Sequence, residues 1–170
     1  MLFRSTGEAL TVHLDDHFDA THIPLTCTAA PVYDAAGHIK AVLDISALSA
    51  PADKNSQHLA LQLVRMYAHK IENAYFLHHY RDQWILRMST APEFLEISPE
   101  YLVAVNASGQ VVGYNHLAGE LFKQHNHGEL MGRAISDLIE LAFDDLPKYL
   151  AARPVDKRAL KIINSLQVMF

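Results

Sequence analysis

Residues 52–91 read ADKNSQHLALQLVRMYAHKIENAYFLHHYRDQWILRMSTA and contain neither glycine nor proline, unlike the segments on both sides. Because these two residues are the main interruptions of regular structure, the stretch predicts a long helix. Asp53, Asn55 or Ser56 can cap its start, since each carries a side-chain oxygen that accepts a hydrogen bond from a first-turn amide. We expect the helix to run to about Met88.

Apolar residues of this predicted helix recur at alternating spacings of four and three, the pattern of a left-handed coiled-coil seam. The members of the seam are Ala60, Val64, Tyr67, Ile71, Ala74, His78, Arg81, Ile85 and Met88. A second line, Leu59, Leu63 and Met66, widens the apolar face of the N-terminal half and predicts burial on two sides. The polar members His78 and Arg81 either form a proton-sensitive layer in a dimer or lie in water where the helices diverge.

The length of the predicted helix bears on the domain organisation. A helix of about 33 residues spans ~50 Å, whereas a compact globule of this chain length has a diameter of about 40 Å. The chain has 170 residues, enough for one domain or two small ones. We therefore expect two modules joined by the helix.

Both flanks of the helix carry strand and turn signals. Strands are expected at 9–14, 25–33, 39–46, 101–105 and 111–114. Gly37 lies in the loop between the second and third strands, and the sequence NASGQ at 106–110 joins the last two, so two hairpins are predicted. Asn115 is the expected N-cap of a short helix. The fold class predicted is α+β.

Composition excludes several classes of protein. Fourteen Lys and Arg against nineteen Asp and Glu give a net charge of -5, the wrong sign for direct nucleic-acid binding. No apolar run of about 18 residues occurs, so no membrane association is expected. The single cysteine, Cys27, cannot form an internal disulfide, which favours a cytoplasmic location. The eleven histidines indicate metal binding, a pH response or simply polar surface.

One loop is a candidate for metal chemistry. Its potential ligands are His13, Asp15, Asp16, His17, Asp19 and His22. In an extended segment His13 and His17 would lie about 13 Å apart, too far to bind one ion, and Leu14 stands where a zincin needs glutamate. Cys27 has no CxxC partner, and no GxSxG motif occurs. We predict no catalytic residue, metal or cofactor; the alternatives are a small metal-dependent enzyme using this loop and a ligand-free interaction or structural protein.

The order of motifs in the first half resembles a known family. The segments ALTVHLDDHF (9–18), LTCTAAPVYD (25–34), Gly37 and VLDIS (42–46) resemble the second half of the sensory GAF domain in acetoin-catabolism-type regulators, bacterial activators of sigma-54 RNA polymerase. Ala60-Leu61, LVRM (63–66) and IEN (71–73) match the closing helix of that domain, and WILR (84–87) with PEFL (92–95) matches its exit. The resemblance implies a partial GAF-like sheet at 1–50 and a connecting, dimerising helix at 51–91.

The chain beyond Tyr101 resembles a PAS domain, which follows the GAF domain in that family. The resemblance lies in the hairpin around Gly109, the Tyr114-Asn115 step, and LMGR (130–133) leading to SDLI (136–139). It implies a PAS-like antiparallel sheet with short helices at 92–170. The residues expected to line a PAS pocket, or else to fill a ligand-free core, are Leu102, Ala104, Tyr114, Leu121 and Phe122.

The resemblance implies a sensory module of a transcriptional regulator. No GxxxxGK[ST] phosphate loop occurs, and no helix-turn-helix is expected, so we predict neither ATPase nor DNA-binding activity in this chain. The expected partners are a second copy of the chain, a small-molecule ligand, and an effector domain or partner protein. The first half of a GAF domain is missing, which predicts a fragment, a truncated gene product or a fold completed by a partner.

Overall fold

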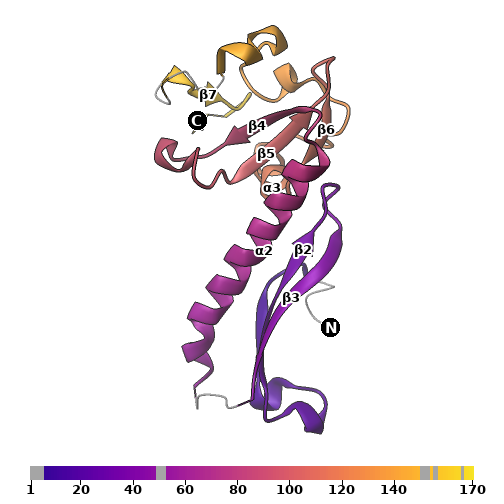
Figure 1. The fold of residues 1–170 in the computed structure, drawn as a ribbon, viewed down its shortest axis with the longest axis vertical. Helices are drawn as coiled ribbons and strands as arrows, with labels where there is room; N and C mark the ends of the chain where they lie inside the picture. Colours follow the sequence, from indigo (N-terminus) through magenta and orange to yellow (C-terminus); the bar gives the residue numbers. More distant parts are fainter. Residues whose placement is uncertain (1–5, 49–52, 150–153, 155–156, 166) are drawn as a thin grey trace. The chain divides into compact units, whose positions relative to one another are not determined.

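The computed structural model describes the chain except for residues 1–5, 49–52, 150–153, 155, 156 and 166 (Figure 1). The chain divides into two compact units. Unit 1 comprises Met1–Asp34 and His38–Ala74, and unit 2 comprises Ala35–Gly37 and Tyr75–Phe170. Each unit combines an antiparallel sheet with helical segments, so the predicted α+β class is confirmed.

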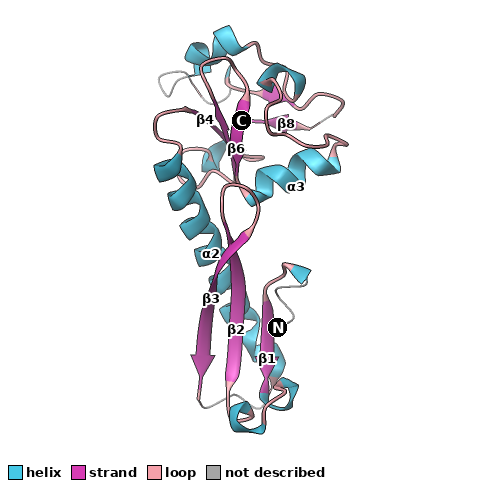
Figure 2. Ribbon diagram, turned by 90° about the vertical axis from the view of Figure 1, so that its right-hand side faces the viewer, coloured by secondary structure: helices cyan, strands magenta, loops and turns pink. Residues whose placement is uncertain are grey.

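The sheet of unit 1 has three antiparallel strands in the order β1-β2-β3 (Figure 2). They are β1 (Leu10–His13), β2 (Thr26–Tyr33) and β3 (Ile39–Ala47). The short 3-10 helices η1 (Leu14–Asp16) and η2 (Ala20–His22) lie between β1 and β2. The predicted hairpin between β2 and β3 is present, and Gly37 has the positive φ of 78° that this turn requires.

Helix α2 (His58–His79) follows the 3-10 helix η3 (Lys54–Gln57). Asp53 caps η3, because its Oδ1 accepts from the Asn55 N–H at 2.8 Å. In unit 1, α2 covers one face of the sheet, where Val64 and Ala68 pack on Ala30 and Val32 (Figure 2). This small buried cluster holds the helix on the sheet.

The helix ends nine residues earlier than predicted, at His79 rather than Met88. The chain turns after it, with Gln83 N–H donating to the Tyr80 carbonyl at 2.9 Å, and continues as strand β4 (Trp84–Met88). The side chains of Leu86 and Met88, two residues apart, are both buried, which is the alternation of a strand. Absence of glycine and proline does not distinguish a helix from a strand, so the prediction merged the two.

The sheet of unit 2 has the order β4-β5-β6, with β5 (Tyr101–Val105) in the middle and β6 (Val111–Tyr114) at one edge. Helix α3 (His116–Gln124) follows β6. The predicted N-cap is confirmed: Asn115 Oδ1 accepts from Ala118 N–H at 3.0 Å and from Leu102 N–H at 3.1 Å. The cap therefore also ties the start of α3 to β5.

The rest of unit 2 is built of short elements. These are the 3-10 helices η4 (Pro92–Phe94), η5 (Ile135–Asp137) and η6 (Phe143–Tyr149), and the strands β7 (Leu160–Lys161) and β8 (Val168–Met169). They contribute to one core cluster in which Phe122, Ile135, Leu138 and Met169 are fully buried. The segment 159–170, whose periodicity favours neither strand nor helix, includes the two strands β7 and β8.

Candidate functional site

Helix α2 carries apolar side chains on a second face that its own sheet does not cover. We call this set the apolar strip; its members are Leu59, Leu63, Met66, Tyr67 and Ile71, each between 40% and 71% exposed. At 100° per residue they lie beside the face of Val64 and Ala68, which are buried against the sheet. Isolated apolar side chains on a surface are ordinary, but a contiguous set marks an interaction surface.

The residues of the predicted coiled-coil seam do not all lie on one exposed face of a single helix. Val64 is 0% exposed within the core of unit 1, so it cannot also contact a second chain. Arg81 lies in the turn after α2, where its Nε is 3.7 Å from Asp82 Oδ2, and Ile85 is in β4. Tyr67, Ile71, Ala74 and His78 remain on α2 and are exposed, whereas Ala60 is half-buried. His78 lies on α2 and Arg81 lies beyond its end, so the two residues do not form the layer of neighbouring helix positions that the proton-sensitive alternative requires.

The five residues predicted to line one pocket are divided between two clusters. Leu102 and Ala104 pack with Phe76 on one face of the unit 2 sheet, whereas Leu121 and Phe122 belong to the main core, with Tyr114 packed against it. Leu102 and Ala104 are alternate positions of β5 and share one face of the sheet, whereas Val103 and Val105 point to the other face and join the main core with Leu121 and Phe122. Burial raises the pKa of Tyr114, and the nearby Glu129 carboxylate adds to the effect.

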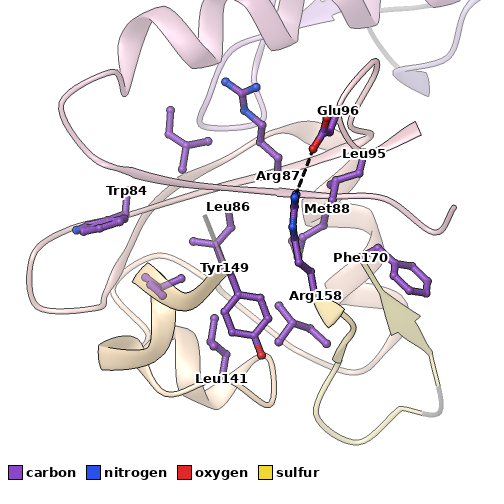
Figure 3. Close-up of a pocket in the computed structure, with 13 residues that line it drawn as sticks. Trp84, Leu86, Arg87, Met88, Leu95, Glu96, Leu141, Tyr149, Arg158 and Phe170 are labelled. Atoms are coloured by element: carbon purple, nitrogen blue, oxygen red, sulfur yellow. Dashed lines mark hydrogen bonds and ion pairs between the residues drawn. The ribbon is translucent and has the colours of Figure 1, made fainter. Parts of the chain in front are cut away.

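Unit 2 contains a cavity of about 400 Å³ that the sequence did not predict (Figure 3). Its lining comes from β4, the segment after η4, η6 and the C-terminal residues. The lining residues are Trp84, Ile85, Leu86, Arg87, Met88, Leu95, Glu96, Leu141, Leu146, Tyr149, Arg158, Leu160 and Phe170. No local motif marks them, because residues up to 86 positions apart in the chain form the wall. The volume lies in the range of small-molecule sites.

Charged groups lie among the mostly apolar walls of this cavity. The Arg158 side chain is only 9% exposed and is paired with Glu96, which is 63% exposed. Arg158 Nη2 and Nη1 lie 3.4 and 3.5 Å from Glu96 Oε1 (Figure 3). These distances exceed the 2.7–2.9 Å or so of a strong charge-assisted hydrogen bond. The lining therefore includes a buried guanidinium, and one of the groups that it contacts, the Glu96 carboxylate, is largely exposed to water.

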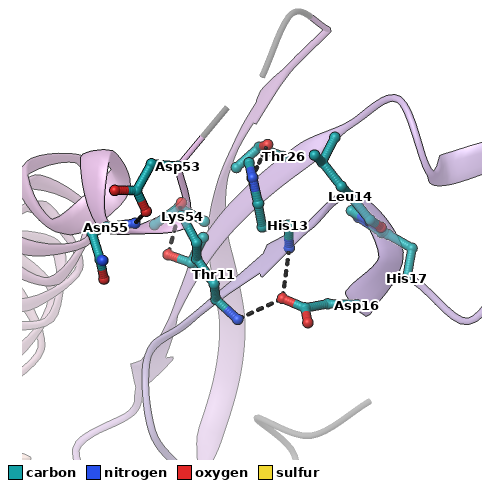
Figure 4. Close-up of polar contacts among 10 residues, drawn as sticks. Thr11, His13, Leu14, Asp16, His17, Thr26, Asp53, Lys54 and Asn55 are labelled. Carbon is teal, nitrogen blue, oxygen red and sulfur yellow. Dashed lines mark hydrogen bonds and ion pairs between the residues drawn. The ribbon is translucent and has the colours of Figure 1, made fainter. Parts of the chain in front are cut away.

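Several polar atoms of the His and Asp loop are hydrogen-bonded within unit 1 (Figure 4), whereas His13 Nε2 and His17 Nε2 are buried without a hydrogen-bond partner among the described residues. His13 Nδ1 is 2.8 Å from Thr26 Oγ1, and the His13 N–H donates to Asp16 Oδ2 at 3.1 Å. Lys54 also pairs with Asp16, and the hydrogen bonds from Lys54 and from the His13 backbone lower the pKa of that carboxyl. Within the described part of the chain, no three His, Cys, Asp or Glu side chains form a group that could hold a metal ion.

Three more of the predicted ligands, His17, Asp19 and His22, make contacts within the loop. His17 Nδ1 donates to the Leu14 carbonyl at 2.9 Å, and its ring stacks on that of His22 at 6.3 Å between centroids. Asp19 Oδ1 accepts from the Thr21 N–H, which lowers the pKa of Asp19. Cys27 is half-buried, with its Sγ 3.2 Å from Ser46 Oγ. These contacts are those of a hydrogen-bonded loop and strand.

The chain is 48% identical over 165 residues, 95% of its length, to the acetoin catabolism regulatory protein of Cupriavidus necator. The predicted resemblance to acetoin-catabolism-type regulators is confirmed. The matched region is 25% of that protein, so the chain spans about a quarter of the length of this curated relative. No family model matches the chain.

Among solved structures, the chain is similar to the E. coli DhaR(N)-DhaL complex at 17% identity. The match covers 92% of this chain and 50% of the other, with a TM-score of 0.34. A TM-score this low does not establish a shared fold. Among the helices of the described residues, none combines the length and apolar character needed to cross a membrane.

Proposed function

We propose that the chain is a sensory and regulatory module of a bacterial transcriptional regulator of the sigma-54-dependent type, located in the cytoplasm and not an enzyme. In this proposal a GAF-like part reaches to residue 50, a connecting helix follows, and a PAS-like part occupies 92–170, with β4 added to its sheet. The 48% identity to a quarter of a regulatory protein supports it. Output then depends on an effector domain or a partner protein.

We further propose that the module acts as a homodimer through α2. The apolar strip carries this proposal, because its members are exposed on a helix whose other face already packs on the sheet. A two-fold axis brings identical patches together, so the strip of a second copy is the natural complement. Full burial of an exposed Leu, Ile or Met contributes about 1.5–3 kcal/mol; the members of the strip are 40–71% exposed, so each gains part of this on association.

The proposed transmission of a signal uses α2, because this helix contributes residues to both units. Residues 58–74 of the helix belong to unit 1 and residues 75–79 to unit 2. A ligand or partner that changes the packing of Tyr67, Ile71 and Ala74 against a second copy therefore changes the helix that enters the PAS-like part.

A buried carboxylate couples the sheet of unit 1 to this helix. Glu72 on α2 is 8% exposed, and its Oε1 accepts from the Tyr33 N–H at the end of β2, at 2.7 Å. Its Oε2 lies 3.5 Å from His69 Nδ1 one turn earlier. A shift of β2 is therefore passed directly to the middle of α2, which supports a signalling role for the helix.

The experiment is sedimentation of the wild type and Ile71→Asp at tens of micromolar. We expect the wild type to be dimeric and Ile71→Asp to be monomeric with an unchanged circular dichroism spectrum, because a carboxylate in the interface lacks a partner. Gln62→Asp is the matched control, since it adds the same charge at an exposed α2 position off the strip. A dimeric Ile71→Asp, or dissociation by Gln62→Asp to the same extent, contradicts the proposal.

A further inference from the structure

We propose that β3 pairs antiparallel with the β3 strand of a second copy of the chain, so that the two three-stranded sheets of unit 1 join edge to edge. This inference rests on the proposed dimer and deepens it, because it adds a second part to the interface and defines its geometry. The central pair of the joined strands is Val42 with the partner's Val42.

Strand β3 is one of the two edges of the unit 1 sheet (Figure 2). It is nine residues long and pairs with β2 along one side. Among the described residues, no strand pairs with its other side. A long edge strand presents a row of unpaired backbone N–H and C=O groups, which another strand can satisfy. Strand β3 is therefore able to extend the sheet.

The helix-covered face of the sheet is left open at β3. Ala30 and Val32 of β2 pack on α2, and Thr28 shares their face because side chains alternate along a strand. Ile45 lies directly opposite Thr28, so its side chain points to this face as well. Thr28 is 1% exposed, whereas Ile45 is 49% exposed. Helix α2 therefore covers β2 and leaves an apolar surface of β3 uncovered.

The apolar strip lies on the β3 side of α2. The Asp34 N–H donates to the His38 carbonyl next to β3, so the preceding Tyr33 N–H points to the opposite edge of β2, toward β1. Glu72 of α2 accepts that Tyr33 N–H and so marks the β1 side of the helix. At about 100° per residue, all five members of the strip lie about 100–180° around the helix from Glu72.

Edge pairing brings these uncovered surfaces together. A two-fold axis perpendicular to the joined sheet makes the two β3 strands antiparallel and places both α2 helices on the same face. With strands ~4.8 Å apart, the two copies of β2 lie three spacings, or ~14 Å, apart. A helix with its side chains is about 10–12 Å across, so two helices lying over these strands bring their strips into contact. The strips then close over the open side of both β3 strands.

Charge favours one register of the paired strands. With Val42 at the two-fold axis, Lys40 lies opposite the partner's Asp44, and the axis repeats this pair. Both side chains are exposed, and opposite charges on directly opposed residues stabilise a sheet. A lysine at a sheet edge normally discourages pairing, but here it meets a carboxylate. On the helix-covered face the same register places apolar Ala41 opposite the partner's Leu43.

The test compares charge reversals on β3 by sedimentation at a series of concentrations. Asp44→Lys puts two lysines opposite each other at two places, so we expect the dimer Kd to rise at least about tenfold. Lys40→Asp should have a similar effect, and the double variant Lys40→Asp with Asp44→Lys should return to within about threefold of the wild type. Asp15→Lys is the matched control, since it makes the same charge change at an exposed position away from β3 and should change the Kd less than about threefold.

A cysteine at the proposed axis tests the geometry without a change of charge. In a Cys27→Ser background, which removes the single native thiol, Val42→Cys should form a disulfide between copies under mild oxidation. Directly opposed Cα atoms lie about 4.5–5.5 Å apart, within the range of a disulfide. Ser46→Cys on the same strand is the control, because its two copies would lie about 26 Å apart in this register.

The outcomes separate this inference from the proposed α2 dimer. Unchanged dimers in the charge reversals, a double variant that stays dissociated, or a Ser46→Cys disulfide that forms as fast as that of Val42→Cys overturns the joined sheet. If Ile71→Asp still dissociates the dimer in that case, the α2 interface stands without the pairing of β3. A monomeric wild type overturns both proposals.

Discussion

The cores of the two units differ in where the chain places its large apolar side chains. The core of unit 1 is a cluster of Ala30, Val32, Val64 and Ala68, all small or β-branched, while Leu59 and Ile71 of the same unit are exposed. Unit 2 buries Phe122, Leu138 and other large side chains in one cluster. Unit 2 thus has a core of large apolar side chains, and the small core of unit 1 fits the proposal that a second copy covers its exposed apolar side chains.

The largest expected effect is in the core of unit 2. Phe122→Ala should lower the free energy of unfolding by about 3–5 kcal/mol, because Phe122 is fully buried and its removal leaves a cavity. Urea unfolding followed by circular dichroism measures the loss. Phe94→Ala is the control, since Phe94 is 57% exposed and should cost less than about 0.5 kcal/mol. If the two variants lose similar free energy of unfolding, the core of unit 2 is not the source of its stability.

A smaller effect is expected in the core of unit 1. Val64→Ala removes two fully buried methyl groups and should cost about 1–2 kcal/mol. Leu63, its neighbour on the apolar strip, is 40% exposed, so Leu63→Ala should weaken dimerisation while leaving the unfolding of the dilute monomer within about 0.5 kcal/mol. Unfolding at high and low protein concentration separates these outcomes. If Leu63→Ala lowers the free energy of unfolding of the monomer by more than this, Leu63 belongs to the core of unit 1 and not to a surface strip.

The smallest effect concerns the surface of unit 1. The pKa of Asp16 is lowered from 3.8 by Lys54 and the His13 backbone, so the folded state favours the ionised carboxyl. Its contribution to stability is therefore present above pH 3.8 and is lost as the pH falls through the lowered pKa. Asp16→Asn should be slightly less stable than the wild type at neutral pH and equal to it at strongly acidic pH. Asp15→Asn, at an exposed neighbouring position, is the control; a deficit for Asp16→Asn that persists in acid would show a different cause.

The parts of the fold that the sequence predicted correctly are those with a local physical signal. Asn115 was predicted as a cap because a short polar side chain precedes an apolar helical pattern, and the loop around Gly37 was predicted as a turn. Trp84–Met88 was missed because five apolar and basic residues fit a helical seam as well as a strand. Only pairing with β5, whose residues lie thirteen to twenty-one positions further along the chain, decides between a helix and a strand.

The candidate sites required information that periodicity does not contain. Val64 and Ile71 are both apolar and both fit the predicted seam, yet one is fully buried and the other is 46% exposed. The periodicity of the sequence does not determine which row of apolar side chains on α2 packs against the sheet. The cavity was missed for a related reason: Arg158 and Glu96 meet across 62 residues, and neither lies in a motif.

The central claim is that the apolar strip of α2 is covered by a second copy of the chain. Light scattering of the wild-type protein at tens of micromolar tests it most directly. The account predicts a mass twice that of one chain, falling to that of one chain on dilution. A mass of one chain throughout the concentration range would contradict it.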